Sequence, residues 1–199
     1  MKICCLDLEG VLVPELWVAV SKAYDVPALM RTTRDEPDYY KLMALRLNAL
    51  KENHLGYNEI MAVINEVDPM PGAKAFLDEL RTLSNVVIIS DTYIEFTPPI
   101  LKKLGYPTIF CNSLDIAPDG EITGHHLRVE NSKVSTVRGL QSIGFETIAA
   151  GDSYNDLGMI RESSAGFLFR TTDAIRAANP DIPAYETYGD FLAAFKRAL

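Results

Sequence analysis

Short apolar runs recur along the chain, and most of them end at a turn or at a polar residue. The first run, KICCLDL at residues 2–8, is apolar at almost every position and carries a carboxylate near its end. A run of this kind predicts a strand that is covered on both faces of its sheet. Four later runs are also short and apolar, are each bounded by a turn or a polar residue, and predict further strands at residues 86–90, 108–111, 147–151 and 165–169.

Helical patterns fill the intervals between the later strands. Residues 71–83 begin with a proline, and residues 95–104 and 132–143 are each followed by a glycine. These are common start and stop signals of helices. The alternation of strand and helix predicts right-handed crossovers, and therefore an α/β fold with a doubly wound parallel sheet whose ligands bind beyond the carboxyl ends of the strands.

The segment around Asp119 and Gly120 departs from this alternation. The two residues lie between two short extended runs, which is a pattern that predicts a tight β-hairpin. We expect this hairpin to extend the sheet at its edge.

Residues 14–70 contain no convincing strand and show only helical patterns. We interpret this segment as a small helical cap domain inserted after the first strand, with residues 1–13 and 71–199 forming the core domain. A cap at this place would lie over the carboxyl ends of the strands, where it can shield a site from water. The predicted cap helices are residues 15–24, 38–53 and 57–67.

Composition and charge narrow the classes of partner. With 199 residues, 48% of them hydrophobic, the chain can bury one substantial core. Its 27 acidic residues outnumber 19 basic ones and give a net charge of -8, which disfavours nucleic acid and anionic membrane surfaces as partners. An anionic substrate therefore needs a local cationic site. No apolar run approaches the roughly 20 residues of a membrane span and no leader pattern opens the chain, so we expect a cytoplasmic protein.

The three cysteines lack the spacing of a zinc site, and an odd number argues against a closed set of disulfides. Cys4 and Cys5 are neighbours on a predicted strand, so their side chains are expected on opposite faces. We interpret Cys4, Cys5 and Cys111 as plain buried thiols.

Two carboxylates close the first predicted strand. Asp7 and Glu9, in the string DLEGV, are two positions apart and would point to the same side of an extended backbone. Such a pair repels itself unless a cation lies between the two groups or one of them takes up a proton. The alternative is an exposed strand end at which both acids are solvated.

A second acidic string, GDSYND at residues 151–156, follows another apolar strand. Mg²⁺ prefers oxygen ligands and often takes only one or two carboxylates, so we predict a magnesium site formed by Asp7, Asp152 and the backbone carbonyl of Glu9. Asn155 and Asp156 fall at the start of the next helix, where capping of that helix is the alternative explanation for either residue.

Two further residues complete a candidate site. Ser90 ends another buried strand, where its hydroxyl could hold a phosphate oxygen. Lys133 lies one residue inside a predicted helix and could neutralise an acyl phosphate or steady the Asp7 carboxylate, although taken alone it is better explained as a surface lysine. In a doubly wound sheet, Asp7, Ser90, Lys133 and Asp152 would converge on one crevice.

The strings DLEGV, IISD, NSK and GDSYND resemble the four ordered motifs of the haloacid dehalogenase superfamily, and the resemblance covers essentially the whole chain. Within that superfamily the sequence is most similar to the phosphoserine phosphatase group. It is particularly similar to the bifunctional phosphoserine phosphatase/homoserine phosphotransferase branch, in which DLEGVLVPE, SDT and AAGDSYND occur together. The resemblance implies a Mg²⁺-dependent reaction on a small molecule, phosphoserine, with water or L-homoserine as the acceptor.

The resemblance also implies a role for each matching residue. Asp7 would be the nucleophile that becomes an aspartyl phosphate, and Glu9 would protonate the leaving hydroxyl and later deprotonate water or an acceptor alcohol. Asp152 would hold Mg²⁺. Ser90 and Lys133 would bind the phosphoryl group, and Asn155 would lie on the phosphate side of the site. Asp91 is a further candidate substrate-binding residue.

Two departures from the wider phosphatase pattern match the bifunctional branch. Glu9 stands where most members carry a second aspartate, and Ser90-Asp91-Thr92 stands where many phosphoserine phosphatases have Ser-Gly-Gly. The longer acid moves its carboxyl group outward, and the backbone amides near phosphate could be arranged differently. These residues leave open whether water or homoserine is the better acceptor.

Arg46 lies near the middle of a broad apolar arc on one of the predicted cap helices. A buried arginine needs an anion, which could be a substrate carboxylate, with Glu15 receiving the substrate ammonium. The helix alone equally allows a stem packed on the core with its head in water, or an internal ion pair. The resemblance, in which an acid and an arginine at these positions clamp the amino acid, favours the substrate interpretation.

Other features carry less chemistry. His125 and His126 would face opposite ways on a strand, which disfavours a shared metal ion, and the amphipathic carboxyl-terminal stretch is expected to be a helix packed on the sheet. Three rival functions stay open: a phosphatase or mutase acting on sugar phosphates or nucleotides, a metal-free dehalogenase, and a non-catalytic binding module with the same fold. The intact set of acids favours the enzyme, and the resemblance implies phosphoserine as its substrate.

Overall fold

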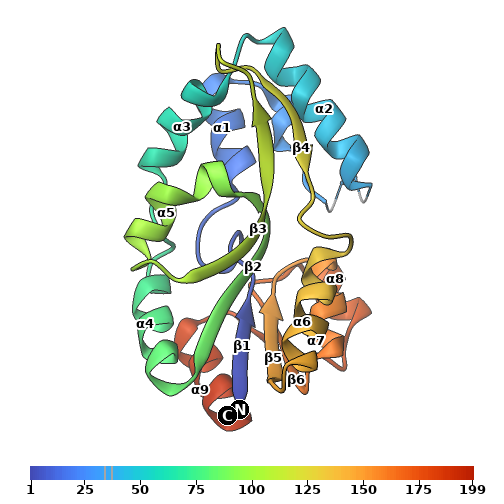
Figure 1. The fold of residues 1–199 in the computed structure, drawn as a ribbon. Coiled ribbons are helices and arrows are strands. Elements are labelled where there is room, and N and C mark those ends of the chain that lie inside the picture. The colour runs from blue at the N-terminus through green and yellow to red at the C-terminus, as the bar shows by residue number, and fades with distance from the viewer. Residues whose placement is uncertain (34, 37) are drawn as a thin grey trace.

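The computed structural model describes residues 1–33, 35–36 and 38–199. Its centre is a seven-stranded sheet with the strand order β4-β3-β2-β1-β5-β6-β7 (Figure 1). Neighbouring strands run parallel except β3 and β4, which form an antiparallel hairpin. This confirms the predicted α/β fold with a hairpin at the edge of a parallel sheet. The strands are β1 (Lys2–Leu6), β2 (Asn85–Tyr93), β3 (Thr108–Ile116), β4 (Ile122–His126), β5 (Glu146–Gly151), β6 (Ala165–Phe169) and β7 (Ala184–Tyr185).

Helices cover both faces of this sheet. On one face, Phe76 of α4 and Phe191 of α9 join the hydrophobic cluster that contains Cys4. On the other, Val137 of α6 joins the cluster that contains Cys5. The adjacent cysteines therefore point to opposite faces, as predicted. The helices are α1 (Leu16–Tyr24), α2 (Tyr39–Glu52), α3 (Tyr57–Glu66), α4 (Ala73–Leu83), α5 (Thr97–Lys103), α6 (Ser132–Ser142), α7 (Leu157–Glu162), α8 (Asp173–Ala178) and α9 (Tyr188–Ala198), with short 3-10 helices η1 (Pro27–Met30), η2 (Ile94–Phe96) and η3 (Tyr154–Asp156).

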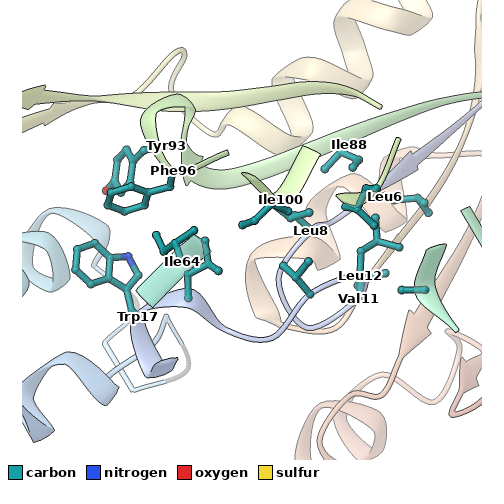
Figure 2. Packing of buried hydrophobic residues seen from close by; sticks show 14 of the residues in the cluster. Leu6, Leu8, Val11, Leu12, Trp17, Ile64, Ile88, Tyr93, Phe96 and Ile100 are labelled. Atoms are coloured by element: carbon teal, nitrogen blue, oxygen red, sulfur yellow. The ribbon is translucent and has the colours of Figure 1, made fainter. Parts of the chain in front are cut away.

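The first three helices lie together beyond the carboxyl end of β1, in the upper part of Figure 1. They occur close to the three predicted positions. Their apolar side chains continue the core of the sheet, because Trp17 and Ile64 belong to the same cluster as Leu6, Phe96 and Ile100 (Figure 2). One cluster thus runs from the sheet into these helices, and the division into a core domain and a cap domain stays a prediction.

The β3–β4 hairpin connects the edge of the sheet to the helical layer formed by α1, α2 and α3. The backbone N–H of Tyr57 donates to the carbonyl of Gly120, at the hairpin turn, over 2.8 Å, and Lys51 lies 3.6 Å from Glu121. A Cβ atom at Gly56 would approach the same Gly120 carbonyl to 2.8 Å, so the close passage of the two backbones requires a glycine. The hairpin tip therefore supports the loop between α2 and α3.

β2 is longer than the sequence pattern predicts. It continues through the polar Ser90, Asp91 and Thr92 to Tyr93, with an irregular register against β3 beyond Ile89. Polar residues end the apolar pattern, but pairing with β3 resumes past them and carries the strand to the site.

Among the short elements, β7 and α8 were not predicted. β7 has two residues and α8 has six, which is too short for either to show a period in the sequence. The helix expected at the carboxyl end is α9, and its Phe191 ring stacks on Phe169 of β6 at 4.4 Å. Within the described part of the chain, no helix is long and apolar enough to cross a membrane.

Candidate active site

A small cavity of about 60 Å³ lies at the carboxyl ends of β1, β2 and β5 and is bordered by residues of α1, α2 and α6. Its lining includes each of the nine residues that the sequence analysis selected. The structure thus brings together four motifs that are far apart in the sequence, while the chemical role of each residue stays a prediction. The nine residues are Asp7, Glu9, Glu15, Arg46, Ser90, Asp91, Lys133, Asp152 and Asn155.

Asp7 follows β1 and its carboxylate is held from two sides. Its Oδ1 accepts a hydrogen bond from the backbone N–H of Leu8 over 2.8 Å and lies 2.9 Å from Nζ of Lys133. Asp7 and Lys133 are only 5% and 4% exposed, so the interpretation of Lys133 as a surface lysine is wrong. Burial raises the pKa of Asp7 and the nearby Asp156 raises it further, whereas Lys133 lowers it.

Asp156 is the second anion beside Lys133. It is fully buried, its Oδ1 lies 2.6 Å from Nζ of Lys133, and its Oδ2 accepts hydrogen bonds from the backbone N–H groups of Asp152 and Ser153. Asp156 therefore caps the turn that follows β5, as the sequence allowed, and also holds Lys133. Burial lowers the pKa of Lys133. The negative charges of Asp156 and Asp7 raise it by more, so the pKa of Lys133 lies well above its ordinary value. Lys133 is thus a fixed cation.

The two acidic strings meet at Gly10. Gly10 has φ +78°, and a Cβ atom there would overlap the carboxylate of Asp152, so only glycine permits this approach. Carboxylate oxygens of Asp7, Asp152 and Asp156 all lie within 4.8 Å of one another. Side chains from opposite ends of the sequence therefore form one acidic cluster.

This cluster fits a hard cation. Both oxygens of Asp156 already accept hydrogen bonds. Asp7 and Asp152 line the cavity, which makes them the better candidates to hold an ion. A donor set made only of oxygen suits Mg²⁺ rather than a soft metal. The predicted contribution of the Glu9 backbone carbonyl stays a prediction.

The Glu9 side chain turns toward α1. Its Oε2 accepts a hydrogen bond over 2.8 Å from the backbone N–H of Leu16, in the first turn of that helix. Removal from water raises the pKa of Glu9 to about 7, and repulsion by Glu15 adds to the rise, although Leu16, Arg46 and Thr92 act in the opposite direction. A carboxyl group with this pKa can both give and take a proton near neutral pH.

Three consecutive polar residues interrupt the apolar pattern of β2, namely Ser90, Asp91 and Thr92. The backbone N–H of Thr92 donates to Oγ of Ser90 over 3.2 Å, and both side chains are buried. The Asp91 carboxylate accepts from Oγ of Ser132 and from Nδ2 of Asn155. Asp91 therefore contacts side chains of two other motifs. The position of Thr92 in the cavity lining could not be predicted from the sequence, because alternation along a strand does not extend through an irregular register.

Arg46 reaches the cavity from α2. One terminal nitrogen donates to the carbonyl of Arg31 over 2.8 Å, and the guanidinium lies 4.7 Å from the centre of the Trp17 ring. Nε is buried and has no hydrogen-bond partner among the residues that the structure describes. Burial lowers the pKa of Arg46, while Glu9 and, more weakly, Glu15 raise it. Arg46 is only 6% exposed, so its head does not reach open solvent.

Glu15 precedes α1 and lines the same cavity as Arg46. Trp17, two residues later, was missed by the sequence analysis, since a single aromatic residue on an apolar helix face carries no signal of its own. The two histidines lie on β4 and have different surroundings. His126 bonds to Asp115 over 2.9 Å, and the His125 ring lies 5.6 Å from the ring of Tyr39.

The profile of the haloacid dehalogenase-like hydrolase family matches residues 7–161. The chain belongs to this family. This haloacid dehalogenase-like hydrolase is 43% identical over 198 residues to the phosphoserine phosphatase ThrH of Pseudomonas aeruginosa, covering 100% of this chain and 97% of that protein. It is 41% identical to a phosphoserine phosphatase of Pseudomonas syringae pv. tomato, over 100% of this chain and 84% of that one.

The fold of this hydrolase is also found among solved structures. A phospho-aspartyl intermediate analogue of phosphoserine phosphatase matches it with a TM-score of 0.80 over 98% of both chains, at 22% identity. At that identity the match establishes a common fold. Together with the family match, it confirms the resemblance drawn from the four motifs.

Proposed function

We propose that this chain is a Mg²⁺-dependent phosphoserine phosphatase that works through an aspartyl phosphate on Asp7. The observation that carries the proposal is the meeting of Asp7 with Lys133 and Asp152 in one buried cluster at the strand ends. The names of the two Pseudomonas relatives, at 43% and 41% identity over the whole chain, support the choice of substrate.

The cation site fits this activity. Mg²⁺ held by Asp7, Asp152 and the backbone carbonyl of Glu9 would supply positive charge opposite the phosphoryl oxygens. The chain itself contributes the cation Lys133, whose Nζ lies 2.9 Å from Oδ1 of Asp7. Its positive charge offsets negative charge on the phosphoryl group independently of the metal ion. On a protein of net charge -8, these local charges give an anionic substrate a place to bind.

The first half of the reaction is a transfer to Asp7. Leu8 and Lys133 fix the orientation of the carboxylate, which attacks phosphorus as the bond between phosphorus and the serine oxygen breaks. Glu9 gives its proton to that oxygen, so serine leaves as a neutral alcohol. A pKa of about 7 supplies enough of the protonated form for this step.

The second half removes the phosphoryl group. Water attacks the same phosphorus, the now ionised Glu9 takes a proton from the water, and the bond to Asp7 breaks. Phosphate is released and both carboxyl groups return to their starting state. L-Homoserine in the vacated pocket can replace water as the acceptor, because Glu9 can deprotonate its hydroxyl in the same way.

Arg46 and Glu15 are the proposed clamp for the amino-acid part of phosphoserine. The Nε of Arg46 is buried and no described residue accepts its hydrogen bond, which supports this role, since a substrate carboxylate would satisfy it. Glu15 on the same cavity wall offers a negative charge to the substrate ammonium. The proposed partner is therefore a small zwitterionic phosphate ester rather than nucleic acid, and residence in the cytoplasm stays a prediction.

The test is release of phosphate from phosphoserine by the purified chain with Mg²⁺. Asp7→Asn should lose at least about 10³-fold in turnover, because an amide does not attack phosphorus. Asp115→Asn is the matched control, since Asp115 lies on the hairpin and bonds to His126. Turnover by Asp7→Asn equal to that of the control would contradict the proposal.

A further inference from the structure

Asp91 joins three of the motif segments through its carboxylate. Its Oδ1 accepts a hydrogen bond from Oγ of Ser132 over 2.9 Å, and its Oδ2 accepts from Nδ2 of Asn155 over 2.8 Å. Ser132 is the first residue of α6, and Asn155 lies in η3 after β5. Each carboxylate oxygen therefore accepts a hydrogen bond from a different helix of the site.

The backbone of Asp91 adds two more connections. Its carbonyl accepts from the Tyr39 hydroxyl over 3.1 Å and from Nδ2 of Asn112 over 3.2 Å. Tyr39 belongs to α2 in the helical layer and Asn112 to β3. One residue of β2 thus contacts four other elements around the cavity.

These contacts determine how Asn155 presents its amide. Oδ1 of Asn155 accepts a hydrogen bond from Oγ of Ser153, while Nδ2 donates one of its two hydrogens to Asp91. The nitrogen and the oxygen of the amide therefore have fixed positions. Among the described residues no acceptor takes the second hydrogen of Nδ2, which can bind a ligand in the cavity that Asn155 lines.

The hydrogen bond between Asp91 and Ser132 also affects the position of Lys133. Ser132 and Lys133 are consecutive at the start of α6, and Lys133 reaches from there to Asp7. Holding Ser132 in place therefore also limits the movement of the buried ammonium group.

We infer that Asp91 is a positioning residue that holds the Asn155 amide and the start of α6 around the phosphoryl group. This rests on the proposed function, in which the cavity receives that group. Asp91 is predicted from the sequence to bind substrate, and direct binding of phosphate by its carboxylate fits the structure less well. Both carboxylate oxygens already have donors, and a carboxylate facing a phosphate dianion would repel it.

The test is a double-mutant cycle on Asp91→Ala and Asn155→Ala, assayed with phosphoserine. Asp91→Ala should lower kcat by about 10²-fold, the scale of a small misplacement of reacting groups, and change KM by less than about threefold. Because the two residues act together, the double variant should lose at least about fivefold less than the product of the single losses. Asp115→Ala, on the hairpin, is the matched control and should keep wild-type kcat.

Three results would overturn the inference: single losses that multiply in the double variant, an Asp91→Ala loss that lies mainly in KM, or kcat equal to that of Asp115→Ala. If Asp91→Ala does not fold, the same cycle is run with Asp91→Asn, which keeps the size and loses one acceptor, and the same criterion of non-multiplying losses applies.

Failure of the proposed substrate can be told apart from failure of this inference. The same set of variants is assayed with p-nitrophenyl phosphate as the substrate. The dissociation constant of inorganic phosphate is also measured for each variant by calorimetry, which needs no turnover. A wild-type chain that does not hydrolyse phosphoserine contradicts the proposed function. The role of Asp91 is then decided by p-nitrophenyl phosphate hydrolysis and by phosphate binding. A loss in the double variant that is smaller than the product of the single losses supports the role, and a loss equal to that product contradicts it.

Discussion

Replacing Glu9 with glutamine should remove activity and, at the same time, stabilise the metal-free fold at high pH. Glu9 lines the same cavity as Glu15 and has a pKa of about 7, raised from an ordinary value of 4.5. Glutamine cannot ionise, but its side-chain oxygen can still accept the hydrogen bond that Leu16 donates to Glu9. The charge is therefore lost while the local structure is kept.

The size of the effect follows from the two pKa values of this carboxyl group. The folded chain binds the Glu9 proton more tightly than the unfolded chain does, so wild-type stability falls as the pH rises from 4.5 through about 7. At about 1.4 kcal/mol per pH unit, this interval corresponds to about 3 kcal/mol. Below pH 4.5 the carboxyl is protonated in both states and contributes no such pH dependence.

The assay is urea unfolding of both proteins in the presence of a chelator, from pH 4 to pH 8.5. Glu9→Gln should gain about 3 kcal/mol relative to wild type between the two ends of this range, equivalent to a rise in Tm of roughly 6 to 12 °C for a chain of this length. Its kcat for phosphoserine should fall by about 10² to 10⁴, since the proton donor is gone. A stability difference that does not change with pH would refute the reasoning, whatever the activity.

Three further changes test other parts of the site. Arg46→Ala should raise KM for phosphoserine by about 10- to 100-fold, through loss of a hydrogen-bonded charge, and leave KM for p-nitrophenyl phosphate within threefold; equal rises for both esters would contradict the clamp. Lys133→Met leaves Asp7 and Asp156 buried without their cation, so the free energy of unfolding in urea at pH 7 should fall by about 3 to 5 kcal/mol. A fall of less than about 1 kcal/mol would argue against a structural ion pair. A chelator should abolish phosphate release, added Mg²⁺ should restore it, and Asp152→Asn should raise the Mg²⁺ concentration required; turnover that persists in chelator would favour a metal-free reaction.

Much of the site was predictable because a parallel sheet gathers its strand ends. Asp7 and Asp152 each follow an apolar run, and strands of this kind end at the same edge. Helix start signals placed Lys133 at that edge too. The burial of Arg46 followed from the apolar arc of its helix.

The remaining features depend on contacts between side chains, which periodicity does not report. The pairing of Lys133 with Asp156 needs α6 and the turn after β5 to meet, and the contact of Trp17 with Arg46 needs α1 to lie against α2. The irregular register of β2 likewise decides that Thr92 faces the cavity. Tertiary packing sets each of these arrangements, so the local pattern of residues could not.

The most direct test of the account is to identify the residue that carries phosphorus during turnover. The purified chain is mixed with phosphoserine and Mg²⁺, quenched in acid within the turnover time, digested and examined by mass spectrometry. The account predicts one added phosphoryl group on the peptide that contains Asp7, absent from Asp7→Asn. A phosphoryl group on a different residue, or turnover of phosphoserine with no phosphorylated peptide at any quench time, would contradict it.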